Sequence, residues 1–174
     1  MRRQMRGALG ALLAVGIALA VSAPAAAQTT GSETVNGVIV TSGASGERVV
    51  ISSVLVAKGV FDGVGRVVEI PNLPGDPDNV SRDDLVFADG SIHIVTTNLD
   101  FSGSVNAGCL LRGTVQQTGV FAGGTGRFAG ATGSYDGTVI ARILLARNPD
   151  GSCSTEQTPL HEVDMTAMSG TLSF

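Results

Sequence analysis

Two cysteines, Cys109 and Cys153, carry the most definite chemistry in this chain of 174 residues. An even cysteine count in an exported protein is typical of a disulfide, and the first residues of the chain indicate export. A bridge between them would close a loop of about 44 residues and stabilise the fold by roughly 4 kcal/mol at most. The alternatives are two free thiols or a metal pair. Neither the cysteines nor His93 and His161 have the spacing of zinc ligands, so no metal site is expected.

Three side chains are candidates for binding a ligand: Tyr135, Phe121 and Val139. Each lies on the apolar face of a predicted strand, and the Tyr135 hydroxyl either orients a ligand or sits at the rim of a filled core. No residue receives a catalytic role, because nothing in the sequence fixes the geometry of a Ser-His-Asp triad. His93 lies between two isoleucines and is expected on the outer surface. No cofactor is expected.

Acidic residues gather in one segment of the chain. They are Asp76, Asp78, Asp83, Asp84 and Asp89. Their spacing does not match that of a calcium-binding loop, so we expect a solvated, irregular segment over 71–82 and its surroundings.

The first 27 residues have the pattern of a cleaved secretory signal. Arg2, Arg3 and Arg6 precede an apolar run from Ala8 to Val21, which is too short to span a bilayer. Ala25-Ala26-Ala27 then forms an A-x-A site, with cleavage expected between Ala27 and Gln28. We therefore expect residues 1–27 to be a signal peptide and the mature protein to be secreted, with no membrane attachment after its removal.

The mature part, 28–174, has the size of one domain. Its eight cationic side chains against fifteen acidic ones give a net charge of −7. The cations are spread from Arg48 to Arg147 without forming a basic patch, which argues against nucleic acid and anionic membranes as partners. The sequence leaves the oligomeric state open.

Alternating apolar and polar residues predict an all-β fold of about eight antiparallel strands. Asp89-Gly90 is a strong hairpin signal between two of them. We expect strands over 33–41, 49–60, 65–70, 84–87, 91–101, 109–121, 135–147 and 162–174. Eight strands suffice to close a barrel, which removes exposed edges; a two-sheet β-sandwich is the alternative.

The two most regular predicted strands, 109–121 and 135–147, also indicate which side chains face the interior. Their odd positions are apolar, whereas Arg112 and Arg142 fall on the polar face. Small residues on the apolar face at Gly113, Gly119, Gly137 and Ala141 would leave room for a cavity. The predicted interior comprises Cys109 or Leu111, Val115, Phe121, Tyr135, Val139, Ile143 and Val163.

A glycine-rich segment over 123–133 is the most distinctive motif of the mature chain. It does not open a helix, has no Gly-Lys-Ser/Thr and lacks the calcium repeat, so nucleotide and calcium sites are not expected. Glycines permit positive φ and tight crossings of a bent strand. We therefore interpret the segment as structural, with Phe128 packed inward.

The same segment, together with Phe87-Ala88-Asp89-Gly90 and Cys109, resembles bacterial exported proteins of the allene oxide cyclase and dirigent barrel superfamily. The likeness covers roughly 35–174 and is specific over about 85–135. It implies an eight-stranded antiparallel barrel with a central cavity, of the kind that lipocalins also have. For function, it implies that the barrel binds a hydrophobic molecule. The barrel would either only bind this molecule or, like the cyclases and dirigent proteins, steer its ring closure or its coupling. No catalytic residue of the family matches this chain residue by residue.

Three functions follow as hypotheses: a barrel that binds a small hydrophobic molecule, an enzyme that steers ring closure or coupling, and a structural or surface-interaction domain. The interior side chains discriminate between them. Two or more buried ionisable groups in a cavity would favour the enzyme, an apolar cavity would favour binding, and a filled interior would favour the structural role.

Overall fold

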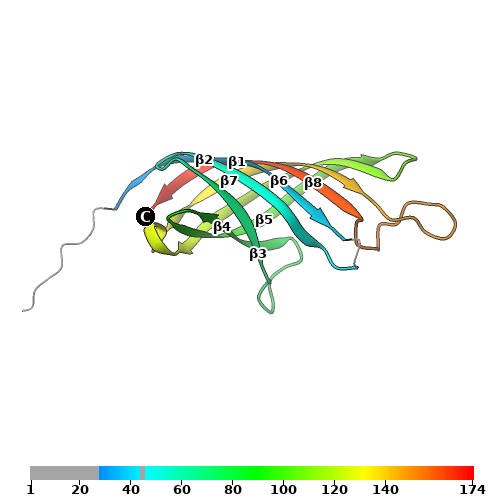
Figure 1. Cartoon of the computed structure of the whole chain (residues 1–174), viewed down its shortest axis with the longest axis horizontal. Coiled ribbons are helices and arrows are strands. Elements are labelled where there is room, and N and C mark those ends of the chain that lie inside the picture. The colour runs from blue at the N-terminus through cyan, green and yellow to red at the C-terminus, as the bar shows by residue number, and fades with distance from the viewer. Residues whose placement is uncertain (1–27, 44–45) are drawn as a thin grey trace, which may run out of the picture.

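The chain folds as a closed antiparallel β-barrel in a computed structural model, which describes residues 28–43 and 46–174. The expected signal peptide, 1–27, lies outside the described residues. The strands are β1 (Thr30–Ser42), β2 (Val49–Gly59), β3 (Gly63–Ile70), β4 (Val80–Phe87), β5 (Gly90–Val105), β6 (Leu110–Gly124), β7 (Thr132–Leu144) and β8 (His161–Ser173). One short 3₁₀ turn, η1 (Gly126–Phe128), precedes β7. Figure 1 shows the strands running along the length of the barrel.

Each strand pairs with its neighbours in the sequence, and β1 pairs with β8 to close the barrel. The closing ladder is long and regular, from Thr30 opposite Ser173 to Ser42 opposite His161. Closure gives every strand two partners, although the β2–β3 ladder is short and joins only Leu55–Ala57 to Gly63–Gly65. The predicted barrel is confirmed and the β-sandwich alternative is wrong. Within the described residues, no helix is long and apolar enough to cross a membrane.

Each of the eight predicted strands is present, with bounds shifted by up to three residues in most of them, as in β7, which was predicted over 135–147. Larger differences occur at two places. β4 begins at Val80, within the segment expected to be irregular. β5 continues to Val105 through a register shift between Asn98 and Asp100. Such a bulge adds one residue to a strand and moves the following side chains to the opposite face. Asn98 and Phe101 therefore both line the interior, although their positions differ in parity.

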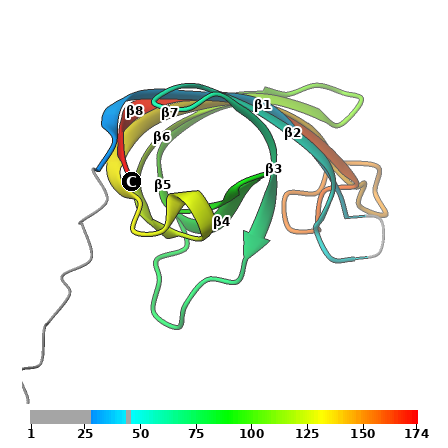
Figure 2. The ribbon, with the colours of Figure 1, turned by 60° about the vertical axis from the view of Figure 1, so that its left-hand side comes forward.

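One end of the barrel is closed by a cluster of aromatic rings. Phe61, Phe87, Phe128 and Phe174 pack in edge-on or tilted contacts with ring centroids 4.7–6.1 Å apart. The guanidinium of Arg127 lies 5.4 Å from the centroid of the Phe174 ring. Figure 2 shows the η1 turn, which carries Phe128, at this end of the ring of strands. Phe128 is fully buried. We call these four phenylalanines the aromatic plug.

The glycine-rich segment makes the plug possible. Gly126 has φ +58°, and a Cβ there would lie 2.2 Å from the carbonyl oxygen of Asp89. Gly123, Gly130 and Gly133 also have positive φ. These are backbone conformations that only glycine adopts readily, so the chain can turn sharply and insert Phe128. The structural interpretation of the motif is confirmed.

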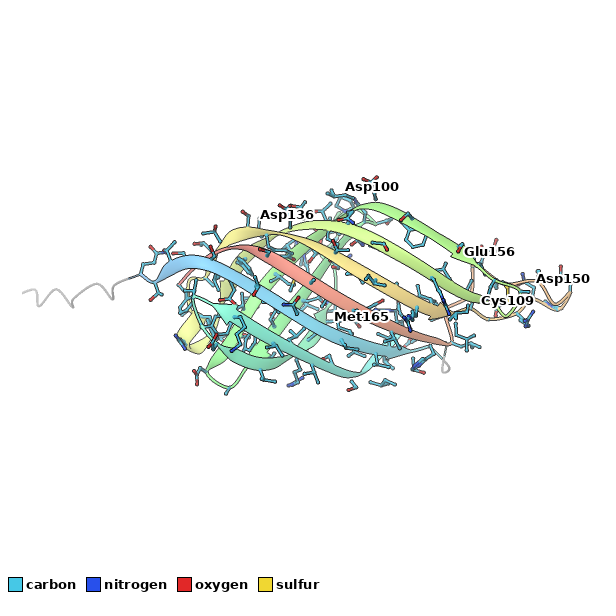
Figure 3. All side chains as sticks on the ribbon, turned by 90° about the horizontal axis from the view of Figure 1, so that it is seen from above. Asp100, Cys109, Asp136, Asp150, Glu156 and Met165 are labelled. Carbon is cyan, nitrogen blue, oxygen red and sulfur yellow. A yellow bond between two sulfur atoms is a disulfide. The ribbon has the colours of Figure 1, made fainter. Side chains whose placement is uncertain are left out.

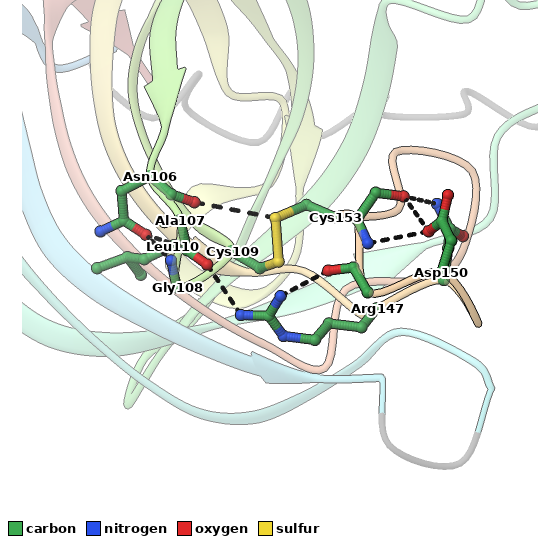
Figure 4. The surroundings of a disulfide bond; sticks show 11 residues. Asn106, Ala107, Gly108, Cys109, Leu110, Arg147, Asp150 and Cys153 are labelled. Atoms are coloured by element: carbon green, nitrogen blue, oxygen red, sulfur yellow. Dashed lines mark hydrogen bonds between the residues drawn. A yellow bond between two sulfur atoms is a disulfide. The ribbon is translucent and has the colours of Figure 1, made fainter.

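Long loops and the disulfide mark the opposite end. Cys109 and Cys153 are bonded, with Cα atoms 5.3 Å apart, which confirms the predicted pairing. The bridge joins the turn of the β5–β6 hairpin to the loop between β7 and β8 (Figure 4). Arg147 strengthens the same junction by donating to the carbonyl oxygens of Ala107 and Gly151 at 2.9 and 2.7 Å. Such a bond is typical of oxidising compartments outside the cytosol.

Candidate functional site

The interior of the barrel contains a cavity of about 340 Å³ that lies between the aromatic plug and the end with the long loops. A volume of this order is at the lower end of the range for small-molecule sites. All eight strands contribute to its wall, because the inward-facing side chain of every second residue points into it.

The deep wall of the cavity is mainly apolar, although Thr96, Gln117 and Thr166 also line the cavity. The apolar part of the wall comprises Leu55, Val67, Leu85, Ile94, Val139 and Met168. Leu55, Leu85 and Ile94 are also part of the buried core that continues to the aromatic plug. This part of the cavity therefore favours an apolar ligand or an apolar portion of one.

The mouth of the cavity is charged. Arg48, immediately before β2, reaches Glu69 of β3 and Glu162 of β8, with 2.9 Å between its Nε and Glu162 Oε2. Its Nη2 lies 3.9 Å from Asp164 Oδ2. Asp83 of β4 lines the same cavity, opposite Glu69 in the β3–β4 ladder. One guanidinium thus faces four carboxyl groups.

Two of these carboxyl groups have strongly raised pKa values. Burial, together with the charge of Glu69, raises the pKa of Asp83 to about 6. Burial and the charge of Glu162 raise the pKa of Asp164 to about 7. Arg48 acts in the opposite direction at both sites but does not cancel the burial effect. Both groups can therefore take up and release a proton near neutral pH.

Tyr135 and Phe121 lie below the cavity rather than in its wall. The Tyr135 hydroxyl is 2.5 Å from Thr96 Oγ1, and Thr96 lines the cavity. Burial raises the pKa of Tyr135 to about 12, so this hydroxyl stays protonated. The ring of Phe121 packs against that of Tyr135, with centroids 5.2 Å apart. Of the three residues predicted to bind a ligand, Val139 alone is in direct contact with the cavity.

The predicted register of β6 and β7 is confirmed. Val115, Val139 and Ile143 line the cavity, whereas Arg112 and Arg142 are exposed. Two of the small residues do not create the expected space. The ring of Phe101 covers Gly113 and that of Tyr135 covers Gly119, so a Cβ at either glycine would lie 2.3 Å from a ring carbon. An aromatic side chain beside a glycine is a common way to stabilise a sheet.

The predicted inward position of Val163 is wrong. Its neighbours Glu162 and Asp164 line the cavity, so Val163 faces outward. Hydrophobic alternation was misleading here because the inward face of β8 changes along its length, from apolar at Met168 and Leu172 to acidic at the mouth.

Asp83 was also misassigned, since it was expected in a solvated segment. In the structure it shares the inward face of β4 with Leu85 and Phe87. One signal could have identified Asp83 and Asp164 as inward-facing: along its strand, each aspartate has the same parity as the apolar inward-facing residues that follow it. Glu69 and Arg48 were not predicted either, because their approach to β8 depends on closure of the barrel.

His93 lies on the outer face of β5, as expected, in contact with Asp84. It contributes nothing to the cavity. Within the described residues, no group of three or more His, Cys, Asp or Glu side chains is arranged to hold a metal ion.

The chain matches no protein-family model, no curated protein and no solved structure. The resemblance to allene oxide cyclase and dirigent barrels thus stays a prediction from the sequence. The closed eight-stranded barrel is the part of that expectation that is observed.

Proposed function

We propose that the protein binds a small molecule with a substantial apolar portion inside the barrel. The cavity of about 340 Å³ carries this proposal, because its deep wall is apolar and it reaches the surface at the charged mouth. A ligand would place its apolar portion against Leu55, Val67 and Ile94 and its polar end toward Arg48 and the carboxyl groups. Burial of apolar surface would supply most of the binding free energy. The expected signal peptide would place this activity outside the cytoplasm, and the Cys109–Cys153 disulfide supports such a location.

Binding can be tested with N-phenyl-1-naphthylamine, a dye that is uncharged at neutral pH and fluoresces in apolar surroundings. We expect saturable fluorescence that 1-octanol displaces. Val139→Phe fills part of the cavity and should weaken binding at least fivefold. Ile140→Phe is the matched control, because Ile140 is the next residue of β7 and faces outward with 47% of its surface exposed. Equal binding by both variants would show that the dye binds elsewhere.

A second proposal is that the barrel catalyses ring closure or another proton-dependent rearrangement of its ligand. Asp83 and Asp164 favour it, because they meet the criterion of two ionisable groups inside the cavity that would favour an enzyme over a binding barrel. Carboxyl groups with pKa values of about 6 and 7 can serve as general acid and base near neutral pH. This fits the sequence hypothesis of a cyclase-like or dirigent-like enzyme, in which an apolar cavity confines the substrate.

A carboxylate base in an apolar cavity can be detected with 5-nitrobenzisoxazole. The base removes its ring C–H proton while the N–O bond breaks, giving a nitrile and a coloured phenolate. We expect a rate that rises with pH and levels off above about 7, and that Asp164→Asn reduces at least tenfold. A rate equal to that of free acetate at the same concentration would contradict the catalytic proposal and leave the binding proposal intact.

A further inference from the structure

One oxygen of Asp164 is buried in the cavity without a hydrogen-bond partner. The residue is 8% exposed, and its Oδ1 is completely shielded and accepts no hydrogen bond from the described residues. Its Oδ2 has only the distant contact with Arg48, at 3.9 Å. Buried polar atoms in proteins nearly always have a partner, because an unpaired one destabilises the fold. Asp164 lines the cavity and has one unused acceptor, which a small rotation of the carboxyl group would turn toward a donor, so this carboxyl group is the one best suited to bind a ligand donor.

The charges around Asp164 do not supply that donor. Arg48 directs its Nε and Nη1 at Glu162 and Glu69 instead. β3, β4 and β8 contribute Glu69, Asp83 and Glu162 to the same cavity. The described residues of β1, β5, β6 and β7 that line it are uncharged. The mouth thus has an excess of negative charge whenever the carboxyl groups are ionised.

We propose that the ligand is an apolar amine whose protonated nitrogen donates a hydrogen bond to the carboxyl group of Asp164 while its apolar portion fills the deep part of the cavity. This inference rests on the proposed binding function and adds the chemical class of the ligand. A carboxylate ligand would be repelled by the excess of negative charge, and an alcohol would gain a hydrogen bond but no charge attraction. A small hydrated cation would leave the apolar wall uncovered.

Titration calorimetry with n-octylamine, 1-octanol and sodium octanoate tests the proposal, because the three compounds share one chain length and differ in the polar end. At pH 8 we expect the amine to bind at least tenfold more tightly than the alcohol and octanoate to bind most weakly. The amine affinity should fall from pH 8 to pH 5, as Asp164 and then Asp83 take up protons. Octylamine remains cationic over this range, and the alcohol affinity should stay constant.

Asp164→Asn should weaken octylamine binding at pH 8 at least tenfold and change octanol binding less than twofold. Asp136→Asn is the control, since Asp136 is an exposed carboxylate of β7 on the outside of the barrel (Figure 3). Both affinities should be unchanged in that variant. The pH series on the unmodified protein gives the same answer without any substitution.

The outcomes separate the two proposals. If octanol binds in the cavity but octylamine binds no more tightly and shows no pH dependence, the amine inference is wrong and the binding function stands. Equal weakening of amine and alcohol by Asp164→Asn also overturns the inference, because it indicates a structural role. If none of the three compounds binds, both proposals are overturned.

Discussion

Asp164 is a residue whose placement opposes folding. Its carboxyl group is moved from water into the barrel, and the pKa rises to about 7 because of burial and the charge of Glu162. In an unfolded chain an aspartate has a pKa of about 3.9. Between these values the folded protein holds a proton that the unfolded chain has released. Proton binding at Asp164 therefore favours the folded state fully only below about pH 3, and this contribution is lost as the pH rises from about 4 through 7.

Replacing this carboxyl group should consequently stabilise the protein at alkaline pH. For Asp164→Asn we expect a free energy of unfolding at pH 8 about 1–3 kcal/mol higher than that of the wild type. The difference should shrink as the pH falls and approach zero below about pH 3, where the wild-type group is protonated in both states. Urea denaturation at several pH values measures both quantities. A variant that is less stable than the wild type at pH 8 would show that the contact with Arg48 outweighs the effect of burial.

Gly119 lies in close contact with the ring of one neighbouring residue, Tyr135. It lies opposite Tyr135 in the β6–β7 ladder, and a Cβ at this position would lie 2.3 Å from Tyr135 Cζ. Because its φ is not positive, the backbone itself would accept alanine. The effect of Gly119→Ala should come entirely from displacement of the ring, at about 1–3 kcal/mol of lost stability.

A double-mutant cycle isolates this contact. In the Tyr135→Leu background the smaller side chain leaves room for a Cβ. Gly119→Ala should therefore cost less than about half of the stability that it costs in the wild-type background. Thermal or urea unfolding of the four proteins gives the coupling. An equal loss in both backgrounds would point to strand propensity rather than to the ring.

At the scale of the strands, sequence patterns predicted most of the architecture. Alternation in β6 and β7 places Val115, Val139 and Ile143 inside. The hairpin that Asp89-Gly90 predicted does form between β4 and β5, with Ala88 and Asp89 as its turn residues and Gly90 as the first residue of β5. These features were predictable because each depends on residues close together in the sequence. The sequence prediction missed the first part of β4. Ser81 and Asp83 face inward there, but they are polar, and polar residues at this spacing are also typical of a loop.

The candidate site was not predictable in the same way. Alternation assigns polar residues to the outside, whereas the mouth of this barrel places carboxyl groups inside. The approach of Arg48 to Glu69 and Glu162 also joins elements far apart in the sequence. That approach depends on the register of the β1–β8 closure, which no local pattern determines.

The disulfide fixes two connecting segments beside the open end of the barrel. Cys109 has φ +61°, and the bond holds the hairpin turn against the loop that contains Cys153. Cys109→Ala/Cys153→Ala should lower the free energy of unfolding by about 2–4 kcal/mol, since the bridge closes a loop with a separation of 44 residues.

The loss should be largest locally. We expect faster amide hydrogen exchange over 106–110 and 145–154 in the double variant, with the strands near the aromatic plug unchanged. Reduction of the wild type with dithiothreitol should reproduce the pattern. Faster exchange throughout the barrel would instead mean that the bridge is needed for the whole fold.

The whole molecule has two different ends. Figure 1 shows η1 and the C-terminus at one end and the connections of β5–β6 and β7–β8 at the other. The plug end is packed with aromatic rings, and its buried Glu33 accepts a hydrogen bond from the backbone N–H of Phe61 at 3.2 Å. The loop end is hollow and charged. Stability therefore resides mainly at one end and the candidate site at the other.

Two phenylalanines test this division, because the same substitution can be made at each end. Phe128 of the plug is fully buried, whereas Phe101 at the mouth is 56% exposed. Phe128→Ala should lower the free energy of unfolding by about 3–5 kcal/mol through lost burial and the cavity left behind. Phe101→Ala removes the same atoms but should lower it by only about 1 kcal/mol, since solvent already reaches much of the ring. Urea denaturation of both variants gives the comparison, and binding of N-phenyl-1-naphthylamine should change more in Phe101→Ala, whose ring lines the cavity. Similar losses of stability at the two positions would show that the mouth is as important to folding as the plug.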